Sequence, residues 1–178
     1  MAVLETIAAQ AGKRALEFLV IGGHAVMAHG FARSTFDLDL LVRGSERPAW
    51  KELMTGLGWR VYAEAPTFLQ FEAPADQPDP VDLMFVNDPT FARLSEAAME
   101  LRGNTIGVKV VSLPHLLALK CHAIKHGHPG RVEKDVDDVI QLVKINRLDV
   151  QAGEFRDIIL KHGVPELYEK LKRISGQN

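Results

Sequence analysis

The stretch VIGGHAVMAHGFARSTFDLDLLV, residues 20–42, contains the features that decide the fold of this 178-residue chain. It begins within a short apolar run, Phe18–Ile21, which predicts a buried strand that two glycines end. Residues 25–28 have the pattern of a short helix, and residues 36–42 alternate between polar and apolar side chains as a strand does. The stretch therefore predicts a strand, a tight turn into a helix, and a second strand that carries two aspartates.

The two aspartates, Asp37 and Asp39, stand two positions apart in that second strand. Alternate side chains of a strand point to one face, so we expect both carboxylates on the same side of the sheet. Like charges placed in this way repel each other, and aspartate is uncommon in strands. A divalent cation that prefers oxygen ligands, Mg²⁺ or Mn²⁺, would remove the repulsion. An edge strand whose carboxylates face solvent is the simpler alternative, because water screens exposed charges.

The glycines Gly22 and Gly23 strengthen the case for a metal–phosphate site. A strand that ends in glycines and enters a helix offers free backbone N–H groups to a phosphate. Without a side chain at these positions, the phosphate can approach the backbone closely. Double glycines also occur in plain turns, so the pair gains its meaning from the aspartates that follow it.

A third carboxylate, Asp82, lies in the otherwise apolar stretch PVDLMFV, residues 80–86. An ionised side chain in such a strand is costly unless it is paired or bound to a metal. An exposed position at the start of the strand is the alternative. If Asp82 joins the first two aspartates, the chain has three carboxylates for one metal site.

Helical and strand patterns alternate in the first part of the chain, and helical patterns follow one another from Leu113 onward. The fold class is therefore α/β (α+β), with a small mixed β-sheet. We expect an α/β core over residues 1–112 and a helical C-terminal subdomain over residues 113–178 packed on it. Besides the strands already named, we predict strands over 59–63, 68–71 and 106–111, and helices over 4–16, 50–57, 132–143 and 155–161.

The composition excludes several classes of protein. A chain that is 47% hydrophobic and 25% charged is too apolar to be intrinsically disordered. The net charge of −2 and the isoelectric point near 6.4 do not indicate a dominant nucleic-acid surface. The apolar runs are far shorter than the ~20 residues of a membrane span, and no signal peptide is recognised, so no membrane association is expected. The single cysteine, Cys121, fits a reducing compartment, and we expect a cytoplasmic protein.

The order Gly-Gly, thirteen intervening residues, Asp-Leu-Asp and a later strand aspartate resembles the nucleotidyltransferase superfamily of DNA polymerase β type. More narrowly, the chain is similar to small bacterial enzymes around the abortive-infection toxin nucleotidyltransferases. The segments that carry this narrower resemblance are GGHA (22–25), HG (29–30), RSTFDLD (33–39), LLALK (116–120) and KDVDD (134–138). The resemblance runs from about residue 18 to residue 143.

The resemblance implies an enzyme that moves a nucleoside monophosphate from an NTP, such as ATP, to an acceptor and releases pyrophosphate. Mg²⁺ (or Mn²⁺) would be held by Asp37 and Asp39, and Asp82 would complete the metal site and help to deprotonate an acceptor hydroxyl. The residues expected to bind the nucleotide are Gly22, Gly23, His24, Arg33 and Lys120.

Several of these residues also have simpler roles. Lys120 either reaches the triphosphate or forms a salt bridge with Asp135, and the two roles are compatible. Arg33 either contacts phosphate or holds the loop before the acidic strand. In the KDVDD segment, residues 134–138, an exposed Lys134–Asp138 pair on a solvated helix face is favoured over a second metal site.

Three functions remain open from the sequence. The acceptor is RNA or protein, with a possible partner protein in a toxin–antitoxin or phage-defence module. Alternatively, the acceptor is a small molecule, an aminoglycoside or lincosamide antibiotic. The third possibility is a catalytically silent module that binds a nucleotide or a partner. A pocket rich in carboxylates would favour a cationic antibiotic, whereas a basic groove from Lys120 to Lys134 would favour RNA. The local sequence favours RNA.

Overall fold

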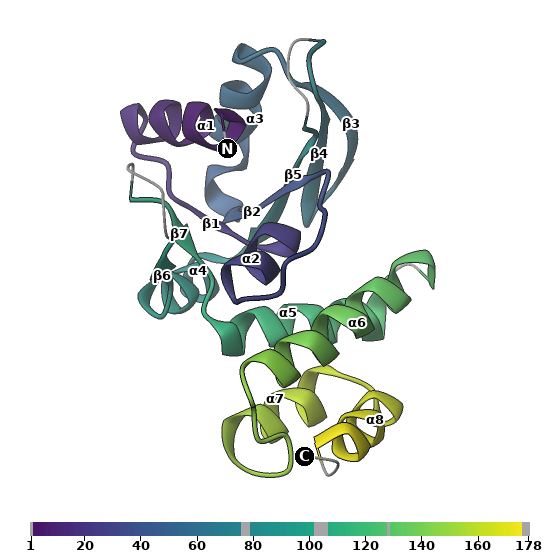
Figure 1. The fold of residues 1–178 in the computed structure, drawn as a ribbon. Helices are drawn as coiled ribbons and strands as arrows, with labels where there is room; N and C mark the ends of the chain where they lie inside the picture. The colour runs from purple at the N-terminus through teal and green to yellow at the C-terminus, as the bar shows by residue number, and fades with distance from the viewer. Residues whose placement is uncertain (1, 76–78, 102–106, 128, 176–178) are drawn as a thin grey trace. The chain divides into compact units, whose positions relative to one another are not determined.

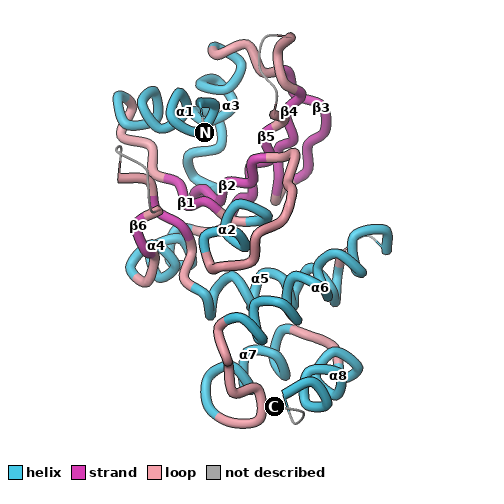
Figure 2. Tube along the Cα trace, viewed as in Figure 1, coloured by secondary structure: helices cyan, strands magenta, loops and turns pink. Residues whose placement is uncertain are grey.

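A computed structural model describes residues 2–75, 79–101, 107–127 and 129–175 of the chain (Figures 1 and 2). The chain divides into two compact units. The first contains residues 1–25 and 33–111, and the second contains residues 26–32 and 112–178. The predicted boundary after residue 112 therefore differs from this division in the segment 26–32, which groups with the second unit.

The first unit is built on a mixed sheet, in agreement with the predicted fold class. Its described strands are β1 (Phe18–Val20), β2 (Leu38–Arg43), β3 (Arg60–Ala65), β4 (Phe68–Glu72), β5 (Val81–Val86), β6 (Met99–Glu100) and β7 (Lys109–Val110). Its helices are α1 (Ala2–Lys13), the start of α2 (Gly22–Ala28), the short 3₁₀ helix η1 (Gly44–Glu46), α3 (Arg47–Gly56) and α4 (Asp88–Glu96).

The strands lie in the order β3-β4-β5-β2-β1-β7-β6. The central strand β2 pairs with β5 in parallel and with β1 antiparallel, and β4 pairs with β5 antiparallel. In this register Asp39 of β2 stands opposite Asp82 of β5, and Asp82 in turn stands opposite Gln70 of β4. Because neighbours in register share a face, three polar side chains meet on one face of the sheet.

The two faces of β2 are covered by different helices. Leu38, Leu40 and Val42 are buried on one face, where α1 and α3 lie (Figure 1). There the Trp50 ring of α3 meets the Phe18 ring edge to face, with 5.9 Å between the centroids. On the other face, the Arg43 guanidinium lies 4.3 Å from the centre of the Phe91 ring of α4. The carboxylates share this second face with Arg43.

The second unit is helical, and its described residues contain the end of α2 together with four further helices. The helix predicted over 132–143 lies within α6, where Val139 and Val143 are buried. The side-chain amide of Asn146 donates to the His29 carbonyl at 3.1 Å, so a residue just after α6 holds the segment that follows α2. The four helices are α5 (Leu113–His126), α6 (Pro129–Ile145), α7 (Gly153–His162) and α8 (Pro165–Ser175).

Some local predictions need correction. The acidic strand begins at Leu38, so Asp37 lies just before β2 and not within it. The strand predicted over 106–111 is described only over Lys109–Val110. The helix α4 and the short strand β6 were not predicted. Among the helices of the described residues, none combines the length and apolar character that crossing a membrane requires.

Candidate active site

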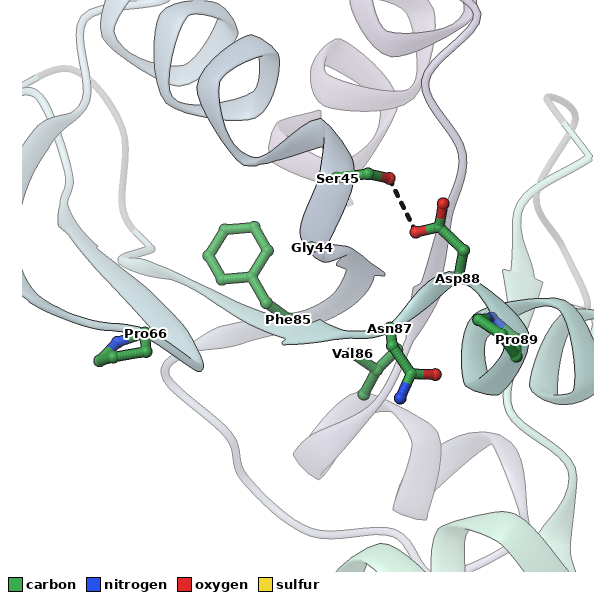
Figure 3. A pocket seen from close by; sticks show the side chains of 8 residues that line it. All are labelled: Gly44, Ser45, Pro66, Phe85, Val86, Asn87, Asp88 and Pro89. Atoms are coloured by element: carbon green, nitrogen blue, oxygen red, sulfur yellow. Dashed lines mark hydrogen bonds between the residues drawn. The ribbon is translucent and has the colours of Figure 1, made fainter.

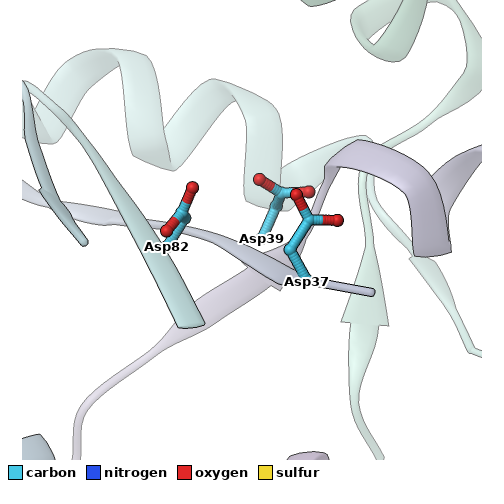
Figure 4. A group of neighbouring side chains, drawn as sticks. All are labelled: Asp37, Asp39 and Asp82. Atoms are coloured by element: carbon cyan, nitrogen blue, oxygen red, sulfur yellow. The ribbon is translucent and has the colours of Figure 1, made fainter. Parts of the chain in front are cut away.

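The three predicted aspartates converge at one place in the first unit (Figure 4). Asp37 precedes β2, Asp39 lies in β2, and Asp82 lies on the neighbouring strand β5. One oxygen from each carboxylate lies within 4.8 Å of the other two. All three side chains are half-buried. The alternative of an exposed edge strand is wrong, because β2 is paired on both sides.

The carboxylate cluster fits a divalent cation. Oxygen ligands on opposite sides of a Mg²⁺ ion are separated by roughly 4.2 Å. The oxygens of the cluster lie within 4.8 Å of one another, so small side-chain movements would bring them to one ion. Three partly desolvated negative charges repel each other unless a cation or a proton joins them. No soft ligand is part of this group, so its oxygens suit Mg²⁺ or Mn²⁺ better than zinc.

Two neutral donors hold carboxylates of the cluster. The Thr35 hydroxyl donates to Asp37 Oδ1 at 2.9 Å, and the Gln70 amide donates to Asp82 Oδ2 at 2.9 Å. Neither residue was identified as functional from the sequence. The sequence does contain a pattern that could have identified Gln70, because this polar residue stands between two apolar residues of β4, Leu69 and Phe71, which are buried. These donors orient the carboxylates without cancelling their charge.

Position 22 has to be glycine because the Asp39 side chain lies directly beside it. Its φ is +59°, in the left-handed region that glycine adopts readily. A Cβ at Gly22 would also overlap the carboxylate of Asp39. The absence of a side chain at Gly22, predicted to let a phosphate approach, is thus already needed to make room for Asp39.

Gly23 makes room for the residues that support Asp37. A Cβ at this position would overlap the Thr35 side chain and lie 3.0 Å from a guanidinium nitrogen of Arg33. Arg33 also donates to the Ser34 carbonyl at 2.9 Å, which fits the predicted role of holding the loop before β2. Contacts of Gly22, Gly23 and Arg33 with a phosphate stay predictions.

His24 follows Gly23 in α2 and interacts with Asp37 and Asp79. It lines a cavity of about 10 Å³ with Val3, Leu4, Leu38 and Asp79. Burial lowers the pKa of the His24 imidazole, so the neutral ring is favoured. The carboxylates of Asp79 and Asp37 act in the opposite direction and raise this pKa. The predicted contact of His24 with a nucleotide stays a prediction.

In the second unit, Lys120 forms the predicted salt bridge with Asp135. Its ammonium lies 2.6 Å from Asp135 and 2.7 Å from Asp138, and all three side chains are buried. The expected Lys134–Asp138 surface pair is therefore wrong, because the Asp138 side chain is only 1% exposed and faces Lys120. The solvated acidic face is wrong for Asp135 as well, while Asp137 is exposed. The predicted contact of Lys120 with a triphosphate stays a prediction.

A separate hollow of about 530 Å³ lies at the other ends of β2 and β5 (Figure 3). Ser45 and Asp88 meet there through a 2.7 Å hydrogen bond. Val86, which lines the hollow, is four positions after Asp82, a span of roughly 13 Å along a strand. This hollow is therefore separate from the carboxylate cluster. Its lining residues are Gly44, Ser45, Pro66, Phe85, Val86, Asn87, Asp88 and Pro89.

No protein-family model matches the chain, and a search of the curated proteins gives no match. Solved structures do match over most of its length. The solution structure of the antibiotic-resistance factor ANT(2'')-Ia has a TM-score of 0.67 at 17% identity, and the match covers 99% of this chain and 97% of that one. The lincomycin-bound lincosamide antibiotic adenylyltransferase LnuA has a TM-score of 0.58 at 13% identity, covering 80% of this chain and 95% of that one.

A third match is an antigenic nucleotidyltransferase-like protein from Paracoccidioides brasiliensis, with a TM-score of 0.55 at 18% identity. It covers 96% of this chain and 91% of that chain. At such low identities the agreement concerns the fold and does not transfer a substrate. The mixed sheet, its helices and the agreement over nearly the whole chain together show that this protein has a nucleotidyltransferase fold.

Proposed function

We propose that the protein is a Mg²⁺- or Mn²⁺-dependent nucleotidyltransferase that transfers a nucleoside monophosphate from an NTP to an acceptor and releases pyrophosphate. The observation that carries the proposal is the convergence of Asp37, Asp39 and Asp82 on one face of the sheet. The nucleotidyltransferase fold supports it, as does the resemblance of the glycine–aspartate segment.

Each aspartate has a part in the proposed reaction. Asp37 and Asp39 would hold the metal ions, and Asp82 would complete the site and accept the proton of the attacking hydroxyl. Bound metal ions would supply charge stabilisation at the α-phosphate and the triphosphate oxygens. Gly22 and Gly23 would offer backbone N–H groups to the β- and γ-phosphates. The bond from the α-phosphorus to the bridging oxygen would break as the bond to the acceptor oxygen forms.

For the acceptor, we propose a hydroxyl group on a small molecule of the aminoglycoside or lincosamide type. Two of the matched proteins are an antibiotic-resistance factor and a lincosamide adenylyltransferase, and both match over most of their chains. The sequence favoured RNA because of a basic groove that begins at Lys120, but that ammonium is buried between two carboxylates. RNA, or a protein of a toxin–antitoxin or defence module in the cytoplasm, is therefore the second candidate.

The test is an acceptor screen with NTPs labelled at the α-phosphate. Each NTP is incubated with Mg²⁺ or Mn²⁺ and with an aminoglycoside, a lincosamide, RNA or a protein extract. The unmodified protein and an Asp37→Asn, Asp39→Asn double variant are compared throughout. We expect metal-dependent transfer of label to a small molecule that the double variant lacks.

The other outcomes of the screen are also informative. Label on RNA or protein would replace the small-molecule acceptor with the second candidate. Equal transfer by the unmodified protein and the double variant would contradict the metal mechanism. If no NTP transfers label to any acceptor while NTP and metal bind, the third possibility, a silent nucleotide-binding module, would take the place of the enzyme.

A further inference from the structure

Gln70 lies beside the carboxylate cluster and is not one of its ligands. It stands directly opposite Asp82 in the antiparallel pairing of β4 with β5. Its side-chain Nε2 donates to Asp82 Oδ2 at 2.9 Å, and both side chains are half-buried. An ionised carboxylate only accepts hydrogen bonds, so the N–H side of the amide has to face it. The strand register therefore determines this contact.

The contact opposes a force that the cluster itself creates. Asp82 stands opposite Asp39 on the other side, and the three carboxylates approach within 4.8 Å. In the absence of a cation, their mutual repulsion would rotate Asp82 away from Asp37 and Asp39. A hydrogen bond from the neighbouring strand limits that rotation, because Gln70 is itself fixed by the pairing of β4.

The chemistry of glutamine suits this task better than that of a cation. A lysine or arginine opposite Asp82 would neutralise one carboxylate and compete with a divalent ion for it. The amide of Gln70 holds one oxygen and leaves the negative charge of the cluster in place. An ionised carboxylate has about four acceptor positions, so a single hydrogen bond leaves room for a metal.

We propose that Gln70 is a positioning residue, which orients the Asp82 carboxylate for metal binding. The proposal deepens the proposed function and rests on it, since it assigns a metal to the same three aspartates. The effect of a substitution distinguishes this role from that of an ordinary cross-strand pair. Substitution in a pair that only stabilises the sheet would lower the stability of the protein, whereas substitution of a positioning residue lowers the metal affinity through Asp82.

The experiment measures Mn²⁺ affinity without nucleotide or acceptor, by the electron paramagnetic resonance signal of free Mn²⁺. Gln70→Leu keeps the size of the side chain and removes the donor, and Gln70→Asn retains an amide that is one methylene too short. Phe68→Leu is the control, because Phe68 lies on the same face of β4 opposite Met84. Thermal unfolding in EDTA establishes whether each variant is folded. If Gln70→Leu does not fold, Gln70→Asn replaces it in the binding measurement.

We expect Mn²⁺ to bind about 10- to 100-fold more weakly to the Gln70 variants, the range typical of residues that orient metal ligands. Phe68→Leu should bind as the unmodified protein does. On an Asp82→Asn background, Gln70→Leu should cause no further loss, because its effect passes through that carboxylate. An unchanged affinity, or an equal loss on both backgrounds, would overturn the role of Gln70 while leaving the proposed function intact. If the unmodified protein binds no Mn²⁺, the metal mechanism itself fails.

Discussion

The substitution Gly22→Ala tests how closely the backbone approaches the carboxylate cluster. The added methyl group would overlap the Asp39 carboxylate, so that side chain would have to move by about 2 Å to reach an ordinary contact. A displacement of only about 1 Å in a reacting centre already costs about 100-fold in rate. Alanine at φ +59° also carries backbone strain of about 1–2 kcal/mol.

The assay separates the displacement from the strain by means of a second glycine. Gly153 has a similar φ of +65°, and no described atom lies within 4 Å of the place that its Cβ would occupy. Gly153→Ala should therefore show the strain alone, as a loss of about 1–2 kcal/mol in the free energy of unfolding in urea. Gly22→Ala should show a similar or larger loss and, in addition, Mn²⁺ affinity reduced by at least about tenfold.

The two variants should differ in Mn²⁺ affinity, because only the methyl group at position 22 meets Asp39. If Gly22→Ala and Gly153→Ala bind Mn²⁺ with the same affinity, the position of Asp39 does not depend on Gly22. In that case the glycine would be needed only for its backbone conformation, and the overlap with Asp39 would have no functional meaning.

Three further predictions concern the rest of the molecule. Lys120→Met leaves Asp135 and Asp138 buried without their cation, so the free energy of unfolding in urea should fall by about 3–5 kcal/mol. The exposed Lys125→Met on the same helix should change it by no more than about 0.5 kcal/mol, and equal losses would refute the structural role of the pair. Burial raises the pKa of the Cys121 thiol to about 12, so a disulfide reagent at pH 8 should label it only in denaturant; rapid labelling of the native protein would contradict its burial. Thr35→Val removes the donor to Asp37 and should weaken Mn²⁺ binding several-fold, while Thr35→Ser should retain it; equal affinities for the two variants would argue against a role for the hydroxyl.

Much of the sheet is predictable because it depends on local patterns. The strand β5, Val81–Val86, lies within the apolar stretch of residues 80–86 that the sequence indicates, since an apolar run with turn residues before it is a strong signal. The helix α4 was missed although it has a recognisable start. Asn87 accepts a hydrogen bond from the Thr90 amide as an N-cap, and Pro89 occupies the first turn. Only Phe91 and Leu94 of that helix are buried, which left its apolar periodicity weak.

The three aspartates of the carboxylate cluster were predictable from the sequence, but the residues that position them were not. The sequence alone shows the spacing of Asp37 and Asp39 and the isolated charge of Asp82. The contact of Gln70 with Asp82 depends on the register of β4 against β5, which the spacing of residues does not reveal. The need for glycine at position 22 depends likewise on where Asp39 comes to lie.

The error at Asp138 has a similar cause. The spacing of Lys134 and Asp138 on one helix favours a surface pair, and the rule for such pairs considers only that helix. In the folded chain α6 packs against α5, and the Asp138 carboxylate meets Lys120 instead. Packing between helices outweighs a pair that contributes only about 0.2–0.5 kcal/mol on an exposed face.

The most direct test of the central claim compares two labelled forms of the same nucleotide. The protein is given Mg²⁺, an acceptor from the screen, and ATP that is labelled at either the α- or the γ-phosphate. If Asp37, Asp39 and Asp82 support nucleotidyl transfer, the α-label moves to the acceptor and the γ-label is recovered as pyrophosphate. Asp39→Asn should abolish both signals. Transfer of the γ-label to the acceptor, or full activity in the Asp39→Asn variant, would contradict the account.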